Sequence, residues 1–164
     1  MSFVSKNEIE QFSFDDCQIA DFNIASDYIE LKLDGLIVNE RNTQNANFTK
    51  SYADTTKLRL NDGKILSVVI AGFSVYDADD NLIERIDDKE VAPMEWDSIP
   101  NKVKGAYLYR MLGEKNDDRY VYDLEIEQYT ETGVPDLRDD TYIIKIEFSG
   151  SIFSWDKYLN RVQN

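Results

Sequence analysis

The sequence predicts an all-β protein of mainly antiparallel strands, a single-domain β-sandwich or barrel of about eight strands with a short C-terminal helix. Three observations support this prediction. Short segments that alternate apolar and polar residues recur along the chain, as half-buried strands do. Clusters of Asp, Asn and Gly lie between these segments and favour turns. Apolar residues at helical spacing occur only near the C-terminus. We therefore expect residues 1–164 to form one domain around one apolar core.

The first part of the chain contains the clearest single strand. Residues 28–33 alternate apolar with charged side chains, which predicts one buried and one exposed face. In residues 12–24 the apolar phase changes at Asp21, so two short strands joined by a bulge or tight bend are expected. Gly35 marks a bend. Residues 39–54 are rich in Asn and Thr and predict a loop or a weak edge strand.

The strongest local turn signal is Asp62-Gly63, which lies between two apolar segments. This pair is typical of a two-residue hairpin turn and would place Leu60 opposite Ile65. The second arm of that hairpin, residues 65–75, is apolar on both faces. It is therefore predicted to lie in the middle of a sheet or inside a sandwich.

The later elements follow from similar signals. Residues 77–81 predict a second hairpin loop, followed by a short strand. Residues 87–105 contain two prolines and predict a long loop with room for one helical turn. Strands are expected at 107–111 and 120–126, joined by a turn at 113–118.

The last two elements differ in period. Residues 142–148 alternate as a strand does. Ser154 is a suitable N-cap, and apolar residues then recur at helical spacing through Val162, which predicts a short helix that packs one face on the sheet.

The charge of the chain restricts its partners. The 32 acidic and 18 basic residues give a net charge of −14. A field of this sign repels phosphates, so direct binding to nucleic acid or to a membrane is not expected. It attracts basic proteins, and a basic protein partner is predicted; an acidic surface kept only for solubility is the alternative. The chain shows no signal-peptide pattern and no segment of ~20 apolar residues, which predicts a cytoplasmic protein.

Several kinds of chemistry lack the residues they need. The chain has no histidine, which excludes Ser-His-Asp and Cys-His catalytic arrangements and the usual zinc sites. The single cysteine, Cys17, cannot form an internal disulfide and is expected to be a buried, unreactive thiol. No phosphate loop, nucleophile elbow or CxxC motif is present, and no carboxylate pair is singled out for glycoside hydrolysis. We therefore predict no enzymatic activity, no cofactor and no metal site.

One segment partly matches a calcium loop. Asp77, Asp79 and Asn81 provide oxygen ligands at alternate positions. The match then fails, because Leu82 replaces the required Gly and Asp88 replaces the bidentate Glu. A calcium-dependent module is therefore only a third hypothesis.

Five Asp-Asp pairs fall at predicted turns or strand ends. Turn chemistry explains each pair singly, since Asp tolerates turn geometry and bonds nearby N–H groups. If several of these turns share one end of the fold, they would form an anionic surface that attracts a basic partner. Trp96 is either a plug over the core or an aromatic anchor for that partner. The candidate partner-binding residues are Asp15, Asp16, Asp79, Asp80, Asp87, Asp88, Trp96, Asp117, Asp118, Asp139 and Asp140.

The start of the chain resembles several small bacterial immunity-protein families of polymorphic toxin systems. These families often open with a phenylalanine, an Asp followed by a small residue, and an Ile shortly before the first long strand. Phe14, Asp16, Cys17 and Ile19 occupy these positions here, and residues 28–33 form the strand. The resemblance covers about a sixth of the chain. It implies a cytoplasmic protein that binds a cognate toxin domain and blocks it without chemistry.

The leading hypothesis is thus a non-enzymatic, acidic binding protein of the immunity type that neutralises a basic toxin domain. The alternative is a small-molecule or carbohydrate-binding β-domain that uses the 10 tyrosines of the chain. A tyrosine-lined pocket open to solvent would favour the alternative.

Overall fold

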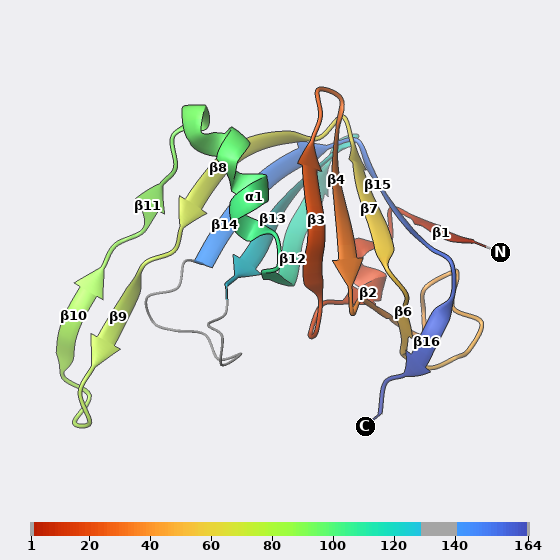
Figure 1. Cartoon of the computed structure of the whole chain (residues 1–164), viewed down its shortest axis with the longest axis horizontal. Coiled ribbons are helices and arrows are strands. Elements are labelled where there is room, and N and C mark those ends of the chain that lie inside the picture. Colours follow the sequence, from red (N-terminus) through yellow and green to blue (C-terminus); the bar gives the residue numbers. More distant parts are fainter. Residues whose placement is uncertain (1, 129–140, 164) are drawn as a thin grey trace.

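The all-β prediction is confirmed by the computed structural model, which describes residues 2–128 and 141–163 (Figure 1). The strands are β1 (Phe3–Lys6), β2 (Phe12–Ser13), β3 (Gln18–Ile24), β4 (Tyr28–Asp34), β5 (Ile37–Val38), β6 (Ser51–Ala53), β7 (Thr56–Asn61), β8 (Lys64–Ile70), β9 (Phe73–Tyr76), β10 (Leu82–Ile86), β11 (Lys89–Glu90), β12 (Tyr107–Asn116), β13 (Arg119–Glu127), β14 (Thr141–Phe148), β15 (Gly150–Trp155) and β16 (Tyr158–Arg161). The helical elements are η1 (Ile9–Gln11), η2 (Pro93–Ser98) and α1 (Ile99–Val103). No helix in this described part of the chain is long and apolar enough to cross a membrane.

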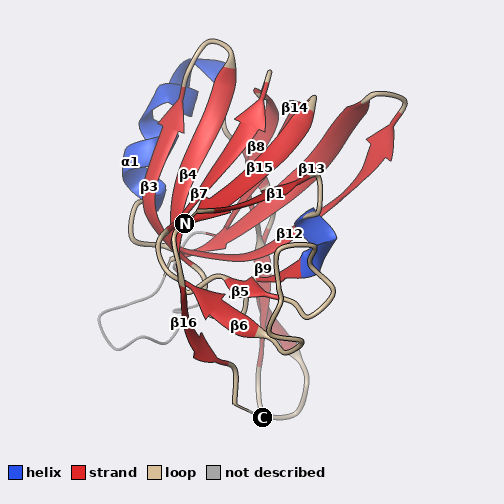
Figure 2. Ribbon diagram, turned by 90° about the vertical axis from the view of Figure 1, so that its right-hand side faces the viewer, coloured by secondary structure: helices blue, strands red, loops and turns tan. Residues whose placement is uncertain are grey.

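A ten-stranded antiparallel sheet forms the body of the protein, in the order β1-β15-β7-β4-β3-β12-β13-β14-β8-β11. A single residue pair, Tyr107 with Gln18, joins β3 to β12. It divides the sheet into a first half (β1, β15, β7, β4, β3) and a second half (β12, β13, β14, β8, β11). The sheet folds over, so that buried side chains from both halves form one sandwich-like core (Figures 1 and 2). A four-stranded sheet, β16-β6-β5-β2, and a separate two-stranded sheet, β10-β9, complete the fold.

Two long strands run next to each other as they pass between the first and the second half of the sheet. Residues 56–70 form β7 and β8, and residues 141–155 form β14 and β15. Gly150 pairs with Asn61 on one side of the crossing, and Glu147 pairs with Lys64 on the other. We call residues 61–64 and 147–150 the paired bend. Each of the two strands keeps the other as its partner through this bend, which is how a strand can change sheets without losing its ladder.

The predicted hairpin at Asp62-Gly63 is therefore wrong. Asp62 does adopt the left-handed conformation that the turn signal implies, with φ 53°. However, Leu60 pairs with Ile29 and Ser151, not with Ile65. The physical reason is that pairing with residues 141–155 buries the apolar face of β7 on the core, which a free two-residue hairpin would not do.

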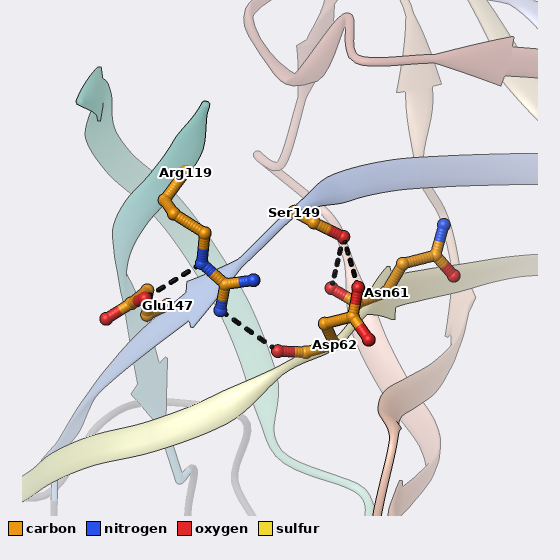
Figure 3. A network of polar contacts seen from close by, with 5 residues as sticks. All are labelled: Asn61, Asp62, Arg119, Glu147 and Ser149. Carbon is orange, nitrogen blue, oxygen red and sulfur yellow. Dashed lines mark hydrogen bonds and ion pairs between the residues drawn. The ribbon is translucent and has the colours of Figure 1, made fainter. Parts of the chain in front are cut away.

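Side chains hold the paired bend together (Figure 3). The Ser149 backbone N–H donates to Asn61 O over 2.9 Å, and the Ser149 hydroxyl lies 2.8 Å from Asp62 Oδ2. From the start of β13, the Arg119 guanidinium donates to Glu147 Oε1 at 2.8 Å and to Asp62 O at 3.1 Å. A third strand is thereby tied to both bent strands.

The apolar segment 65–75 is not the central, doubly buried strand that the sequence predicts. β8 lies next to the short β11 near one edge of the sheet, and Leu66 is 45% exposed. The segment is also broken at Gly72, where a Cβ would lie only 2.0 Å from Ile86 O. Beyond Gly72 the chain leaves the ten-stranded sheet as β9.

The predicted C-terminal helix is also wrong, because residues 150–161 form β15 and β16. Asp54 Oδ1 accepts the N–H groups of Asp156 at 3.0 Å and Lys157 at 3.3 Å, which reverses the chain between the two strands. Trp155 and Tyr158 then both contact the Phe3 ring. Their spacing of three, which resembles a helix, results from this turn. In the part of the chain that the structure describes, the one short α-helix is α1, inside the segment predicted as a loop with a helical turn.

Other local predictions are confirmed. The pairing of β3 shifts register between Ile19 and Asp21, so the predicted bulge is present, although it lies within one strand rather than joining two. Gly35 has φ 78° at the predicted bend. The turn after β12 lies later than expected, at Asp117-Asp118. β12 and β13 thus pair over a longer stretch than their alternation suggests.

Leu58 gives a direct test of the core in the first half of the sheet. Its side chain is fully buried, and it pairs with Leu31 on β4 and Phe153 on β15. Leu58→Ala should lower the free energy of unfolding by about 2–5 kcal/mol, measured by urea denaturation, because it leaves a cavity. The matched control is Lys57→Ala on the exposed face, which should change it by less than about 0.5 kcal/mol. Equal effects of the two variants would contradict this face assignment.

Candidate functional site

A two-stranded arm projects from the body of the protein (Figure 1). We call residues 73–86, which form β9, β10 and the turn between them, the arm. β9 and β10 pair only with each other among the described residues. At the base of the arm, β11 returns to the main sheet by pairing with β8, and the Gly72 N–H donates to Asp88 Oδ1 over 2.6 Å.

The turn at the tip of the arm is built by Asp77. Asp77 Oδ1 accepts the backbone N–H groups of Asp79 at 2.8 Å and Asn81 at 2.9 Å, and Asp77 Oδ2 accepts from the Asn81 amide at 3.2 Å. The donated N–H bond from Asn81 is the main reason why the pKa of the Asp77 carboxyl is lowered. The predicted hairpin loop at 77–81 is confirmed, with Asp80 in the left-handed conformation.

The same contacts bear on the calcium hypothesis. The side chains of Asp77 and Asn81 are hydrogen-bonded to each other, and Asp77 also accepts from the turn backbone. These polar groups are therefore not directed at a common metal position. Within residues 2–128 and 141–163, no group of three or more acidic, cysteine or histidine side chains is arranged to hold a metal ion.

The arm exposes large apolar side chains. Tyr76 is 58% exposed, Leu82 55%, Ile83 65% and Ile86 43%. A two-stranded hairpin without a third layer is of marginal stability in water. These four side chains lie within residues 76–86, and large exposed apolar groups gathered on one segment mark interaction sites more often than singly scattered ones do. The arm is therefore the strongest candidate for a docking surface.

Negative charge surrounds these apolar side chains. Residues 72–90 contain seven acidic and two basic residues, a net charge of −5 out of −14 for the whole chain. Every residue of β10 is exposed. A partner that covers the arm thus has to be complementary to apolar and acidic groups together.

The predicted Asp-Asp pairs do not share one end of the fold. Asp79 and Asp80 lie at the tip of the arm, and Asp87 and Asp88 lie at its base. The other two described pairs lie at opposite ends of β12. Asp15 and Asp16 precede β3 beside the first residue of β12, whereas Asp117 and Asp118 follow its last residue. A ten-residue strand spans roughly 30 Å. Asp139 and Asp140 lie outside the described residues.

Trp96 lies in η2, which follows the base of the arm along the chain. It is half-buried against the core, and its Nε1–H donates to Val91 O over 3.0 Å. Of the two roles that the sequence allows for Trp96, these contacts favour a plug over the core. They also place Trp96 outside the arm.

The residues at the start of β3 form a structural corner. The Tyr52 hydroxyl donates to Asp16 Oδ2 over 2.6 Å, and Gly35 packs so closely that a Cβ would lie 2.4 Å from Asp16 O. Cys17 is completely buried, and burial, with a smaller effect of the Asp34 charge, raises the pKa of its thiol. The expectation of a buried thiol is thereby confirmed, and a neutral thiol is a poor nucleophile.

A second feature is a hollow between the N-terminal segment and the second half of the sheet. It has a volume of about 360 Å³ and is partly open to solvent. Aromatic and thioether side chains line its wall, and charged side chains line its rim. The wall contains Phe12, Phe14, Tyr109, Met111 and Tyr122, and the rim contains Glu10, Asp15 and Arg110.

The hollow exists because the two halves of the sheet separate there. β12 and β3 pair only at the start of β12, so the remainder of that edge of β12 borders the hollow. Register shifts between Leu108 and Arg110, so Tyr109 is an extra residue in β12. Gly113 lies directly opposite Tyr122, and a Cβ there would lie only 2.6 Å from Tyr122 Cγ, so glycine allows the Tyr122 ring to pack across this position.

Charges near the hollow affect its tyrosines. Burial raises the pKa of Tyr109, and the nearby Glu125 carboxylate raises it further. Burial also raises the pKa of Tyr122, with a smaller effect of Glu10. Arg110 forms an ion pair with Glu125, so its charge is locally compensated.

In comparisons with known proteins, no protein-family model, no curated protein and no solved structure matches the chain. The arm and the hollow therefore have to be interpreted from their own chemistry.

Sequence reasoning locates the turn of the arm but misses its exposure. The apolar residues of 65–75 suggest a central strand, and only the break at Gly72 could have indicated that the second part leaves the sheet. The hollow has no sequence signal, since its wall combines the N-terminal segment with the β12–β13 hairpin, which is distant along the chain.

The Asp77 turn gives a pH-dependent prediction. Because its pKa is lowered from the ordinary value of 3.8, the ionised Asp77 stabilises the turn above that pH, and this stabilisation is lost as the pH falls through the lowered pKa. The amide NMR shifts of Asp79 and Asn81 should move together as the pH falls, with a midpoint below pH 3.8. Asp77→Ala should move them at every pH, whereas the control Asp79→Ala should leave Asn81 unchanged. A midpoint above 3.8 would contradict the assigned hydrogen bonds.

Proposed function

We propose that this chain is a non-enzymatic, cytoplasmic binding protein of the immunity type, which docks a basic toxin domain on its arm and thereby neutralises it. The observation that carries the proposal is the arm itself, since it presents exposed apolar side chains inside an acidic surface. Apolar residues provide contact area, and the surrounding carboxylates select a partner of opposite charge.

The charge distribution favours a basic partner over a second copy of the chain. Two arms brought together would each contribute a net charge of −5 from residues 72–90. Like charges at an interface cost several kcal/mol. A basic partner instead gains from long-range attraction, which increases the association rate and weakens as salt is added.

The remaining support is indirect. The N-terminal residues resemble immunity-protein families, and members of such families bind toxin domains without doing chemistry. The absence of histidine from the sequence agrees with a role in binding. The one cysteine is buried and protonated.

A second candidate function is a small-molecule or carbohydrate-binding β-domain. The hollow favours it, because Tyr109 and Tyr122 line a space that is open to solvent rather than being wholly buried in the core. Aromatic walls with a few polar groups are typical of small-ligand sites.

The first experiment is a pull-down with the tagged protein from its own cell lysate at low and at high salt. We expect one basic protein to be retained at low salt and weakened at high salt. The arm variant Ile83→Ser should lower its affinity about tenfold or more, because truncating a central apolar contact removes a large share of binding energy. Binding constants are then measured with the purified partner.

The matched control is Phe48→Ser, which removes a large side chain that is 86% exposed away from the arm. It should bind as the unchanged protein does. Co-expression separates the immunity role from other binding, since the partner should be toxic alone and harmless together with this chain. A partner retained equally by both variants would show that the arm is not the docking surface, and a non-toxic partner would overturn the immunity role.

A further inference from the structure

We infer that the hollow between the N-terminal segment and β12 is a binding site for a compact organic cation, a guanidinium or alkylammonium group. The inference names a ligand class for the second candidate function, small-molecule binding. It rests on that function because it places the ligand in the same hollow. It is independent of the arm.

The wall of the hollow suits a cation. The faces of aromatic rings attract ammonium and guanidinium groups, and the attraction increases when the cation is partly removed from water. Tyr109 and Tyr122 approach the hollow from adjacent strands, and Phe12 and Phe14 approach it from the N-terminal segment. Met111 adds a polarisable thioether to the same wall.

The rim supplies the opposite charge. Glu10 and Asp15 are exposed carboxylates on the lining of the hollow. The only cation on that lining, among the described residues, is Arg110, and its guanidinium forms an ion pair with Glu125. The rim therefore presents the carboxylates of Glu10 and Asp15 beside the partly exposed Tyr122 ring, whereas the Tyr109 ring already has the Arg110 guanidinium 5.7 Å from its centroid.

The size of the hollow limits the ligand. About 360 Å³ is at the lower end of the range of small-molecule sites, which run from roughly 300 to 1,000 Å³. A guanidinium or a substituted ammonium group with a short apolar stem fits this space. The group could belong to a free small molecule or to a basic side chain of a protein, since both present the same chemistry.

A neutral sugar is less well matched to the same site. Sugar recognition needs several polar groups that bind hydroxyls directly. Here the Glu125 carboxylate lies close enough to Tyr109 to raise the pKa of its hydroxyl, and Arg110 forms an ion pair with the same carboxylate. The polar groups that remain at the rim are mainly carboxylates.

The test is an NMR titration of the isotope-labelled full chain, in which the amides of Met111 and Gly113 report on the hollow. The probes are argininamide, tetramethylammonium chloride and glucose. We expect saturable shifts at these amides with both cations and none with glucose. An N-acetylated, C-amidated Gly-Arg-Gly peptide distinguishes a free small molecule from a protein side chain. Only a site for protein side chains should bind this blocked peptide with an affinity similar to that for argininamide.

Substitutions link the shifts to the proposed contacts. Glu10→Gln should weaken argininamide binding about two- to fivefold. This is the effect expected from the loss of one exposed charge near a bound cation. The matched control Glu40→Gln removes an equally exposed carboxylate outside the hollow and should leave the affinity unchanged. Tyr122→Phe should retain binding because it keeps the ring, whereas Tyr122→Leu should lose it.

Tyr122 also packs against Phe148, so the Leu variant is scored only if its unfolding midpoint shows that it is folded. The Glu10 variant does not depend on that condition. Saturable glucose shifts without cation shifts would overturn the cation site and leave the small-molecule function standing. No shift with any probe would overturn both. Equal weakening by Glu10→Gln and Glu40→Gln would reduce the effect to non-specific charge and also overturn the site.

Discussion

The fold depends on the pairing of two long strands through a shared bend. Residues 56–70 and 141–155 are partners on both sides of the crossing, so neither strand has to break its ladder when it passes between the halves of the sheet. The side chain of Ser149 and the guanidinium of Arg119 hold this bend. Elsewhere the two halves are joined by the short pairing of β3 with β12 and by the packing of their shared core.

Both candidate binding features arise at places where this paired sheet ends. The hollow lies where β12 separates from β3. The arm begins beyond the end of β8, where the chain leaves the ten-stranded sheet. The core needs complete ladders and buried apolar faces, so positions without them are free to serve binding. In this sense the arrangement of the body determines where the surface can be apolar and concave.

The sequence predicts elements whose signal is local and fails where the partner is distant. Alternation in residues 28–33 depends only on one buried face, and it predicts β4 correctly. The Asp77 turn is built from its own neighbours. By contrast, Asp62-Gly63 has the composition of a hairpin turn, and only the strand at residues 141–155 makes it a bend. The spacing of Trp155 and Tyr158 is the same in a helix and across a short reversal held by the remote Asp54. The hollow combines the N-terminal segment with the distant β12–β13 hairpin, so no local pattern can indicate it.

The position of β1 has a consequence for how the chain reaches this structure during synthesis. β1 adds to the outer edge of β15, and the Ser2 hydroxyl contacts Asp156, which is 154 positions away in sequence. β1 therefore cannot pair during synthesis until β15 has been made. Folding dominated by such distant contacts is slow, and apolar edges stay open meanwhile. The many carboxylates then protect against association, because nascent chains of strongly negative charge repel one another while their edges are still unpaired.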